Sequence, residues 1–275
     1  MINTNQITIR SLQFIEELEE VRKLESSIWG ENDSIPTHQT LTAVKNGGLV
    51  LGAYDDQKLV GFQYSFPGFD GNSLYLCSHM LGINQSYRNK GIGKLLKIAQ
   101  REEALKLGYT LITWTYDPLE SVNGYLNIAK LGGICSHYIE NCYGEMDDLL
   151  NNGIPSDRFL VEWYIRNDTK TVKKLDNIEL NQVMSESIIQ WEQNEEGFPV
   201  PGKQLALATL ENELAFVAIP KDFRSIRDHN SQLAQEWRMI TRSVFTNLFS
   251  NGWKVIDFHK NNKTELPVQF YVLSK

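Results

Sequence analysis

The sequence lacks any long apolar run. No stretch approaches the roughly 18 apolar residues that a membrane-spanning helix needs, and the opening MINTNQITIR has no apolar core of the kind found in secretory signals. Cysteines are few: Cys77, Cys135 and Cys142 have a spacing that fits neither a disulfide framework nor a metal site. We therefore expect a reduced, soluble, cytoplasmic protein that holds no metal and does not bind membranes.

An excess of positive charge is also absent. The 34 Asp and Glu outnumber the 27 Lys and Arg, which gives a net charge of −7 over 275 residues. This charge argues against the broad basic surface of a nucleic-acid-binding protein, so an anionic ligand has to be bound by a local cluster of cations. One stretch holds such a cluster, formed by Arg88, Lys90, Lys94, Lys97 and Arg101.

Hydrophobic periodicity predicts an α/β protein. Strand patterns occur at residues 7–12, 49–55, 58–66, 73–83, 110–117, 135–144 and 159–165, and helix patterns at 14–29, 37–46, 92–107 and 119–133. The turn-forming Asp55-Asp56-Gln57 joins two of the strands in a hairpin. This order predicts a mixed sheet with helices on its faces.

A second part of the chain is predicted beyond a polar linker at residues 167–180. We place the boundary there, which gives domains 1–166 and 167–275. In the second domain, strand patterns occur at residues 213–220, 253–259 and 267–274, and a long helix pattern at 228–252. This α/β order is compatible with a degenerate copy of the first domain whose loop, residues 220–230, contains no glycine.

Two glycines mark a turn between strand 73–83 and the helix that follows it. In the segment RNKGIG, Gly91 and Gly93 let backbone N–H groups crowd together, and a helix N-terminus adds unpaired donors and the positive end of its dipole. Such a turn binds phosphate, and the alternative is a tight helix entry without a ligand. Leu95 excludes a P-loop, which needs Ser or Thr there, and Leu96 excludes a Rossmann fingerprint, which needs a third glycine.

The remaining pattern, Arg-x-x-Gly-x-Gly, resembles a known family. Residues 85–96 with the preceding strand are similar to motif A of the GNAT acyl-CoA N-acyltransferases, and Lys130-Leu131-Gly132 matches the usual end of the next helix. The resemblance extends over residues 7–165 in element order, and later segments resemble a two-part bacterial branch of the superfamily. It implies a GNAT-like, mostly antiparallel twisted sheet flanked by helices, and acetyl-CoA or another acyl-CoA as co-substrate.

The same resemblance implies which residues contact the coenzyme. Backbone amides of the turn hold the pyrophosphate, while Leu81 and Ile83 hydrogen-bond the pantetheine as an added strand would. Asn123 and Asn127 share a helix face and are candidates for the coenzyme arm, or else form a cap or a solvated face. The coenzyme-binding candidates are Leu81, Ile83, Arg88, Asn89, Lys90, Gly91, Ile92, Gly93, Lys94, Asn123 and Asn127.

His79 is the candidate general base. Acyl transfer from a thioester to an amine needs a group that accepts the amine proton, and histidine titrates near neutrality. Strand alternation places His79 on one face with Tyr75, Cys77, Leu81 and Ile83, unless a bulge intervenes. A hydrogen-bonded core histidine is an equal alternative. Cys77 is interpreted as a small core residue, and the resemblance implies that the Leu81 N–H stabilises the oxyanion.

The proton donor and the acceptor site are less well defined. Ile128 stands where the family usually has a tyrosine, so Tyr125 and Tyr116 are the candidate acids, with an aromatic core role as the alternative for each. Asp117 suits an amine and Arg158 a carboxylate, which together fit an amino-acid-like acceptor, although loop charges are usually solvated. Further polar residues considered for the acceptor site are Glu145, Asp147, Asp148, Arg238 and Arg242.

These observations predict an N-acyltransferase that moves an acyl group directly from acyl-CoA to a small primary amine. Acetyl is the default acyl group, and succinyl is an alternative. Two other hypotheses remain open at this stage: a non-catalytic acyl-CoA-binding sensor and a protein-lysine acyltransferase. We expect a monomer or homodimer with no nucleic-acid partner.

Overall fold

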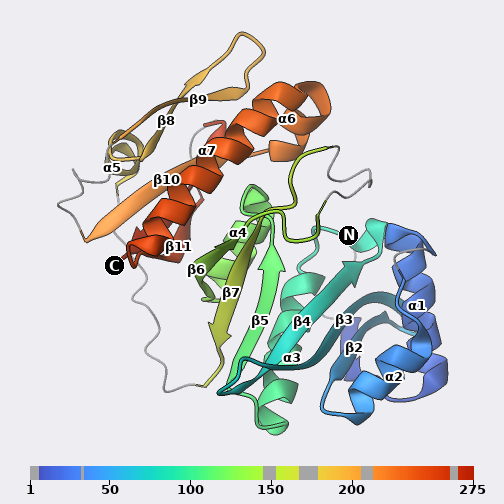
Figure 1. Cartoon of the computed structure of the whole chain (residues 1–275). Helices are drawn as coiled ribbons and strands as arrows, with labels where there is room; N and C mark the ends of the chain where they lie inside the picture. Colours follow the sequence, from blue (N-terminus) through green and yellow to red (C-terminus); the bar gives the residue numbers. More distant parts are fainter. Residues whose placement is uncertain (1–5, 32–33, 145–152, 167–178, 206–212, 261–265) are drawn as a thin grey trace. The chain divides into compact units, whose positions relative to one another are not determined.

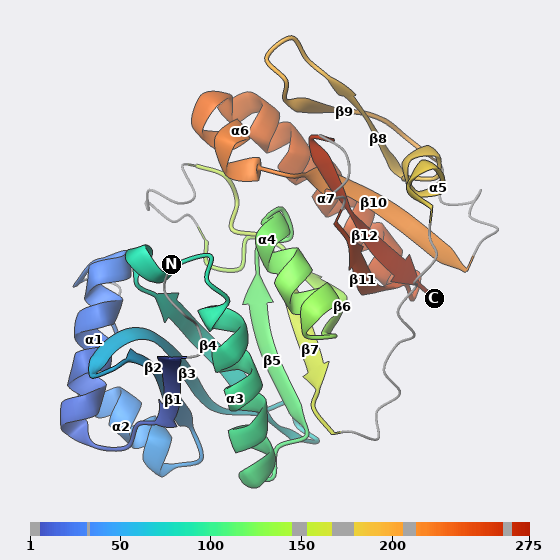
Figure 2. The ribbon, with the colours of Figure 1, turned by 180° about the vertical axis from the view of Figure 1, so that it is seen from behind.

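The computed structural model describes residues 6–31, 34–144, 153–166, 179–205, 213–260 and 266–275. The chain divides into two compact units, one formed by Met1–Trp114 with Tyr164–Thr169 and the other by Thr115–Trp163 with Lys170–Lys275. We describe each unit separately (Figures 1 and 2). Most of the predicted linker lies outside the described residues.

The first unit contains an antiparallel sheet with one parallel strand added at its edge. Its elements are β1 (Ile7–Ser11), α1 (Ile15–Trp29), α2 (Thr37–Lys45), β2 (Leu49–Asp55), β3 (Lys58–Phe69), β4 (Leu74–Ile83), the 3₁₀ turn η3 (Gln85–Tyr87), α3 (Ile92–Lys106) and β5 (Leu111–Tyr116), which ends in the second unit. Strands β1 to β4 pair antiparallel in chain order, and β5 pairs with β4 in parallel. The predicted hairpin, strands and helices of this region are confirmed.

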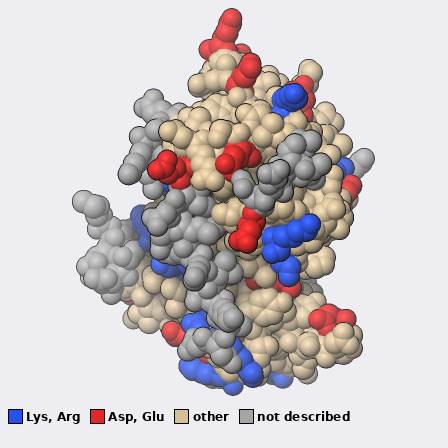
Figure 3. All heavy atoms as spheres, turned by 90° about the vertical axis from the view of Figure 1, so that its left-hand side faces the viewer, with Lys and Arg blue, Asp and Glu red and all other residues tan. Residues whose placement is uncertain are grey.

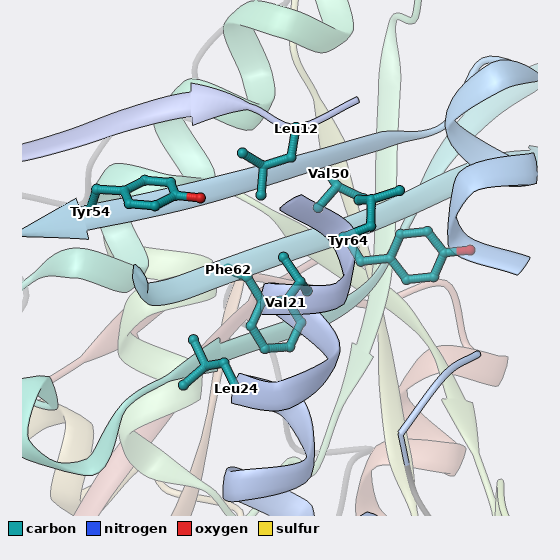
Figure 4. Close-up of a cluster of buried hydrophobic side chains, with 8 residues drawn as sticks. Leu12, Val21, Leu24, Val50, Tyr54, Phe62 and Tyr64 are labelled. Atoms are coloured by element: carbon teal, nitrogen blue, oxygen red, sulfur yellow. The ribbon is translucent and has the colours of Figure 1, made fainter. Parts of the chain in front are cut away.

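Helices cover both faces of this sheet: α1 and α2 lie on one face and α3 on the other (Figures 1 and 2). On the first face, Leu18, Val21 and Leu24 of α1 belong to a buried cluster with Phe62 and Tyr64 of β3 (Figure 4). Burying each such side chain contributes about 1.5–3 kcal/mol. This cluster packs α1 against β3, and Met80 of β4 packs against it.

The second unit contains a wholly antiparallel sheet and a separate hairpin. Its elements are α4 (Ser121–Gly124), the π-helical segment η4 (Tyr125–Lys130), β6 (Ile134–Ile139), β7 (Arg158–Tyr164), α5 (Leu180–Ser185), β8 (Ile189–Gln193), β9 (Pro199–Gln204), β10 (Leu214–Pro220), α6 (Phe223–His229), α7 (Ser231–Ser250), β11 (Lys254–His259) and β12 (Val268–Ser274). The sheet order is β7-β6-β11-β12-β10, and β8 pairs with β9.

Polar contacts join residues 115–163 to the C-terminal part of the same unit. The Tyr116 and Tyr271 hydroxyls lie 3.1 Å apart, and Tyr271 also donates to the Pro118 carbonyl at 2.9 Å. Arg242 of α7 forms a bidentate pair with the buried Asp157 at 2.8 and 2.7 Å. These contacts explain why the compact units divide the chain differently from the sequence boundary at residue 166, which stays a prediction.

The C-terminal half differs from the sequence prediction in three places. The predicted helix 228–252 is two helices, because Asn230 leaves the helical conformation and caps α7 by accepting from the Leu233 N–H at 3.0 Å. Helix α6 occupies most of the predicted loop 220–230, and α5 with the β8–β9 hairpin was not predicted. The α/β class is confirmed, but a degenerate repeat is not.

The surface shows charges of both signs. On the face drawn in Figure 3, acidic and basic side chains are spread among uncharged residues, as the small net negative charge suggests. Within the described ranges, no helix is long and apolar enough to cross a membrane.

Candidate functional site

The predicted phosphate turn connects β4 to α3 in the first unit. Asn84 begins it by accepting from the Ser86 N–H at 3.1 Å, and Asn89 has a positive φ of 61°. Gly91 caps α3 with φ 79°, a left-handed conformation that favours glycine, and no atom lies within 4 Å of a Cβ added there. The sequence pattern therefore folds as a tight, open entry into a 15-residue helix.

The entry to α3 presents free backbone donors. The first helical bond runs from the Leu95 N–H to the Gly91 carbonyl at 3.2 Å, so the N–H groups of residues 92–94 have no partner within the helix. Around them, Arg88, Asn89 and Lys94 are exposed. Lys90 lies over the Tyr87 ring at 4.8 Å. Unpaired donors, the helix dipole and nearby cations together suit a phosphate group.

Lys97 does not belong to this cationic cluster, which corrects the sequence interpretation. Its side chain is buried between α3 and the sheet, with 4% of its surface exposed. Arg101 donates to the Ile165 carbonyl at 3.1 Å instead of pointing at the turn. The local cluster is therefore Arg88, Lys90 and Lys94.

A β-bulge at His79 changes the faces of β4. Ser78 pairs with Ser65 and Met80 pairs with Tyr64, so His79 is an extra residue that β3 does not match. Because alternation is interrupted there, Leu81 contacts the position of Gly93 on the α3 side, while His79 lies beside Phe66 and Tyr64 on the α1 side. Uninterrupted alternation would have placed them on one face; the bulge that the sequence left open as the alternative is present instead.

The bulge is followed by an open edge of β4. The Asn84 N–H donates to the Val60 carbonyl at 2.9 Å, which makes this a hydrogen-bonded pair. Since such pairs alternate in antiparallel ladders, Leu81 and Ile83 direct their backbone groups away from β3. The β4–β5 pairs that the structure describes are Leu76 with Ile112 and Cys77 with Thr113, so they end before this edge begins. Arg88 donates to the Ile83 carbonyl at 3.3 Å.

His79 is a half-enclosed imidazole at the bulge. Its ring centroid lies 6.0 Å from that of Tyr64 and 5.5 Å from that of Phe66, although the residue as a whole is exposed. Partial burial against these rings lowers the pKa of His79 below its usual 6.5. The neutral, proton-accepting form therefore predominates at neutral pH.

A buried carboxyl group lies on the same side of the sheet. Glu25 of α1 is 3% exposed and accepts from the Ile35 N–H at 3.2 Å. Burial raises the pKa of Glu25. Burial also raises the pKa of Tyr64, and the nearby Glu25 carboxyl raises it further. Sequence analysis missed Glu25 because α1 is rich in exposed acidic residues, and nothing in its spacing distinguishes this one.

Comparison with known proteins agrees with this geometry. The family model described as the acetyltransferase (GNAT) family matches residues 18–125, which include β4, the turn and α3. This segment, which is less than half of the chain, is similar to the GNAT acetyltransferases. No curated protein matches the chain.

Three solved structures with a similar fold have low sequence identity to this chain. The ribosomal-protein-S18-alanine N-acetyltransferase of Escherichia coli is 15% identical, with a TM-score of 0.48, over 60% of this chain and 98% of the other. Naa50 of Arabidopsis thaliana, in complex with a bisubstrate analogue, is 16% identical, with a TM-score of 0.46, over 57% and 97%. An aminoglycoside 6′-acetyltransferase type Ii is 20% identical, with a TM-score of 0.46, over 58% and 97%.

The remaining coenzyme and acid candidates lie in the second unit. Tyr116 is buried, and burial together with Tyr271 raises its pKa well above 10. Tyr125 is partly exposed, and the ammonium nitrogens of Lys130 and Lys260 lie 4.9 Å and 5.0 Å from its ring centroid. The predicted helix 119–133 contains the π-helical η4, so Asn123 and Asn127 are not simply one α-turn apart. Asn127 is buried and Asn123 partly exposed.

The acceptor candidates of the second unit already have partners within it. Asp117 pairs with Arg238, and it accepts from the Leu119 N–H at 2.8 Å. Arg158 donates to the Asp157 carbonyl at 2.9 Å and lies over the Tyr143 ring at 5.2 Å. Glu145, Asp147 and Asp148 lie outside the described residues. Across the ranges described, no group of three or more His, Cys, Asp or Glu could hold a metal ion.

Proposed function

We propose that the chain transfers an acetyl group from acetyl-CoA directly to a primary amine of a small molecule. The turn at residues 84–94 would hold the coenzyme pyrophosphate, and the β4 edge at Leu81 and Ile83 would hold the pantetheine arm. The observation that carries this proposal is the adjacency of two sets of backbone donors. Free amides open α3, and the open edge of β4 leads directly to them. A diphosphate joined to an amide-containing arm needs both kinds of donor.

In the proposed reaction, the amine nitrogen attacks the thioester carbonyl carbon while His79 accepts the amine proton. The Leu81 N–H donates to the carbonyl oxygen as negative charge develops there. The carbon–sulfur bond then breaks, and the thiolate takes up a proton to become free coenzyme A. Of the two tyrosine candidates, Tyr116 has its hydroxyl buried against Tyr271.

For the acceptor we propose a small primary amine. Aromatic rings around His79 would pack against the carbon chain that carries the amine. An amino-acid-like acceptor has less support, since Arg158 and Asp117 are engaged within the second unit.

The coenzyme site can be tested with a variant that leaves the fold intact. A Cβ at Gly93 meets Leu81 at 3.6 Å, an ordinary contact, and its φ is not positive. Gly93→Glu should stabilise α3, because it replaces glycine and puts an acid in the first turn, yet it should repel a pyrophosphate. We expect coenzyme A affinity, measured by calorimetry, to fall at least tenfold more in Gly93→Glu than in the neutral control Gly93→Gln.

Equal affinities in the two Gly93 variants would contradict the placement of the pyrophosphate. The acceptor is tested separately by following free thiol with acetyl-CoA and two panels, small primary amines and lysine-containing peptides. Release of thiol with small amines only supports the proposal. Release with peptides only would make the chain a protein acetyltransferase and overturn the acceptor class.

A further inference from the structure

A lysine is buried directly beneath the bulge that carries His79. Lys97 lies one and a half turns into α3, and its ammonium or amine nitrogen donates to the Ser78 hydroxyl at 2.7 Å. The same nitrogen lies 3.6 Å from the centroid of the Trp114 ring. Both contacts are within the first unit, and they place the end of Lys97 at the residue that precedes His79 in the chain.

Burial of the Lys97 side chain has a desolvation cost. Within the described part of the chain it has no carboxylate partner, and the titratable group whose charge affects its pKa is the Cys77 thiol of β4. Burial shifts the pKa of Lys97 well below its usual 10.5. Methionine has a similar length and would fill the same space without a desolvation cost. Packing alone therefore does not explain a lysine at this position.

Hydrogen bonds from α3 hold β3 and β4 together on one side of the bulge. Gln100 of α3 donates to the Ser65 hydroxyl at 2.8 Å and accepts from the Ser78 hydroxyl at 3.4 Å. Ser65 and Ser78 are the last matched pair before the bulge, and His79 is the unmatched residue that follows. Two side chains of α3 thus hold the two residues from which the bulge begins.

We propose that Lys97 is a positioning residue for acetyl transfer. Through Ser78 it fixes the start of the β4 bulge against α3, the helix proposed to bind the coenzyme at its N-terminus. It thereby holds His79 and the Leu81 amide at the positions that the thioester requires. This inference rests on the proposed roles of the turn and of His79. A bulge that slid by a fraction of an ångström would leave coenzyme binding at the turn intact but misplace the base.

The test separates turnover from binding and from stability. Lys97→Met should lower kcat at least tenfold, leave coenzyme A affinity within twofold of the parent protein, and leave the melting temperature unchanged or raised. Lys106→Met is the matched control, since Lys106 is an exposed lysine at the end of the same helix, and its kcat should not change. A residue that merely supports the fold would lower kcat, affinity and melting temperature together.

Ser78→Ala keeps the experiment decisive if Lys97→Met does not fold. It removes the hydroxyl at the other end of the contact with little change in volume, and it should lower kcat by a similar factor. The double variant should lose no more than either single one, because both break the same contact. Unchanged kcat in either folded single variant, or losses that multiply in the double variant, would overturn the proposal. Failure of the coenzyme assignment would show instead in the Gly93 variants.

Discussion

The two faces of the β3–β4 strand pair differ in what they contribute. Towards α1, Phe62 and Tyr64 join an apolar cluster with the helix. Towards α3, the alternating residues Gln63 and Ser65 join a buried polar network with Lys97. One pair of strands therefore has a face that stabilises the fold and a face that is costly to bury.

This difference separates stability from positioning. Apolar burial is insensitive to small shifts, because dispersion and hydrophobic contacts have little directionality. Hydrogen bonds at 2.7–2.8 Å are directional, so the α3 face can define where the strand bends even though it adds little stability. At the bulge, Ser78 is bonded to Lys97 on the α3 face and the next residue, His79, lies beside Tyr64 on the α1 face.

The largest expected effect is on the apolar face. Phe62→Ala should lower the free energy of unfolding by about 3–5 kcal/mol, because the 1%-exposed ring packs edge-on against Trp29 and leaves a cavity when removed. The measurement is denaturant unfolding. Phe69→Ala is the control on the same strand, since that ring is 63% exposed and its loss should change stability by less than about 0.5 kcal/mol.

The next effect concerns the bulge itself. His79→Gln should lower kcat/KM by about 100-fold with little change in coenzyme affinity, because glutamine cannot accept the amine proton. Since burial lowers the pKa of His79, the acid limb of the parent pH–rate profile should lie below pH 6.5 and should be missing from the variant. His38→Gln, at an exposed histidine of α2, serves as the control. A retained rate and acid limb would make His79 a packing residue.

A smaller effect should appear in the pH dependence of stability. The folded-state pKa of Lys97 is lowered, so between that value and about 10.5 the unfolded chain binds a proton that the folded chain does not. The free energy of unfolding should therefore rise with pH in this window, by up to about 1.4 kcal/mol per unit from this residue. Denaturant unfolding from pH 7 to 10 should give a flatter dependence for Lys97→Met than for the parent. Parallel curves would mean that Lys97 is charged when folded.

The smallest effect distinguishes two buried amides of the polar face. Gln100→Met should cost about 1 kcal/mol of unfolding free energy, because both ends of its amide are bonded to serines. Gln63→Met should cost less, since its buried Oε1 has no partner among the described residues and removing it relieves a penalty. A larger loss for Gln63→Met would indicate that its oxygen is bonded to water.

Local patterns were enough to predict much of the first unit. The hairpin at Asp55-Asp56-Gln57, strand β4 and the glycine turn before α3 follow from residues close together in the sequence, because turn chemistry and periodicity are local properties. Strand alternation predicted the faces of the β4 residues correctly as far as His79, but not those of Leu81 and Ile83 after it. A single unmatched residue shifts every later side chain to the other face, and the sequence around His79 contains no pattern that predicts the bulge.

Helix boundaries in the second unit show a different limit. Asp222 and Asn230 both cap helices through their side chains, and both are residue types that signal a helix start. The uninterrupted helical period from residue 228 onward hid the second of these signals. The π-helical turn of η4 has no sequence signature at all, since it depends on how the following chain packs.

The sequence by itself predicted the GNAT resemblance, the candidate coenzyme turn and the candidate base, because these depend on residue types at fixed short spacings. Tertiary structure decided which charged residues are inside. Glu25 and Lys97 look like ordinary residues of charged helices until those helices pack on β3 and β4. Burial then raises the pKa of Glu25 and lowers that of Lys97, which favours the neutral form of each. The reason is physical: desolvation depends on everything that surrounds a group, and its surroundings come from residues far away in the chain.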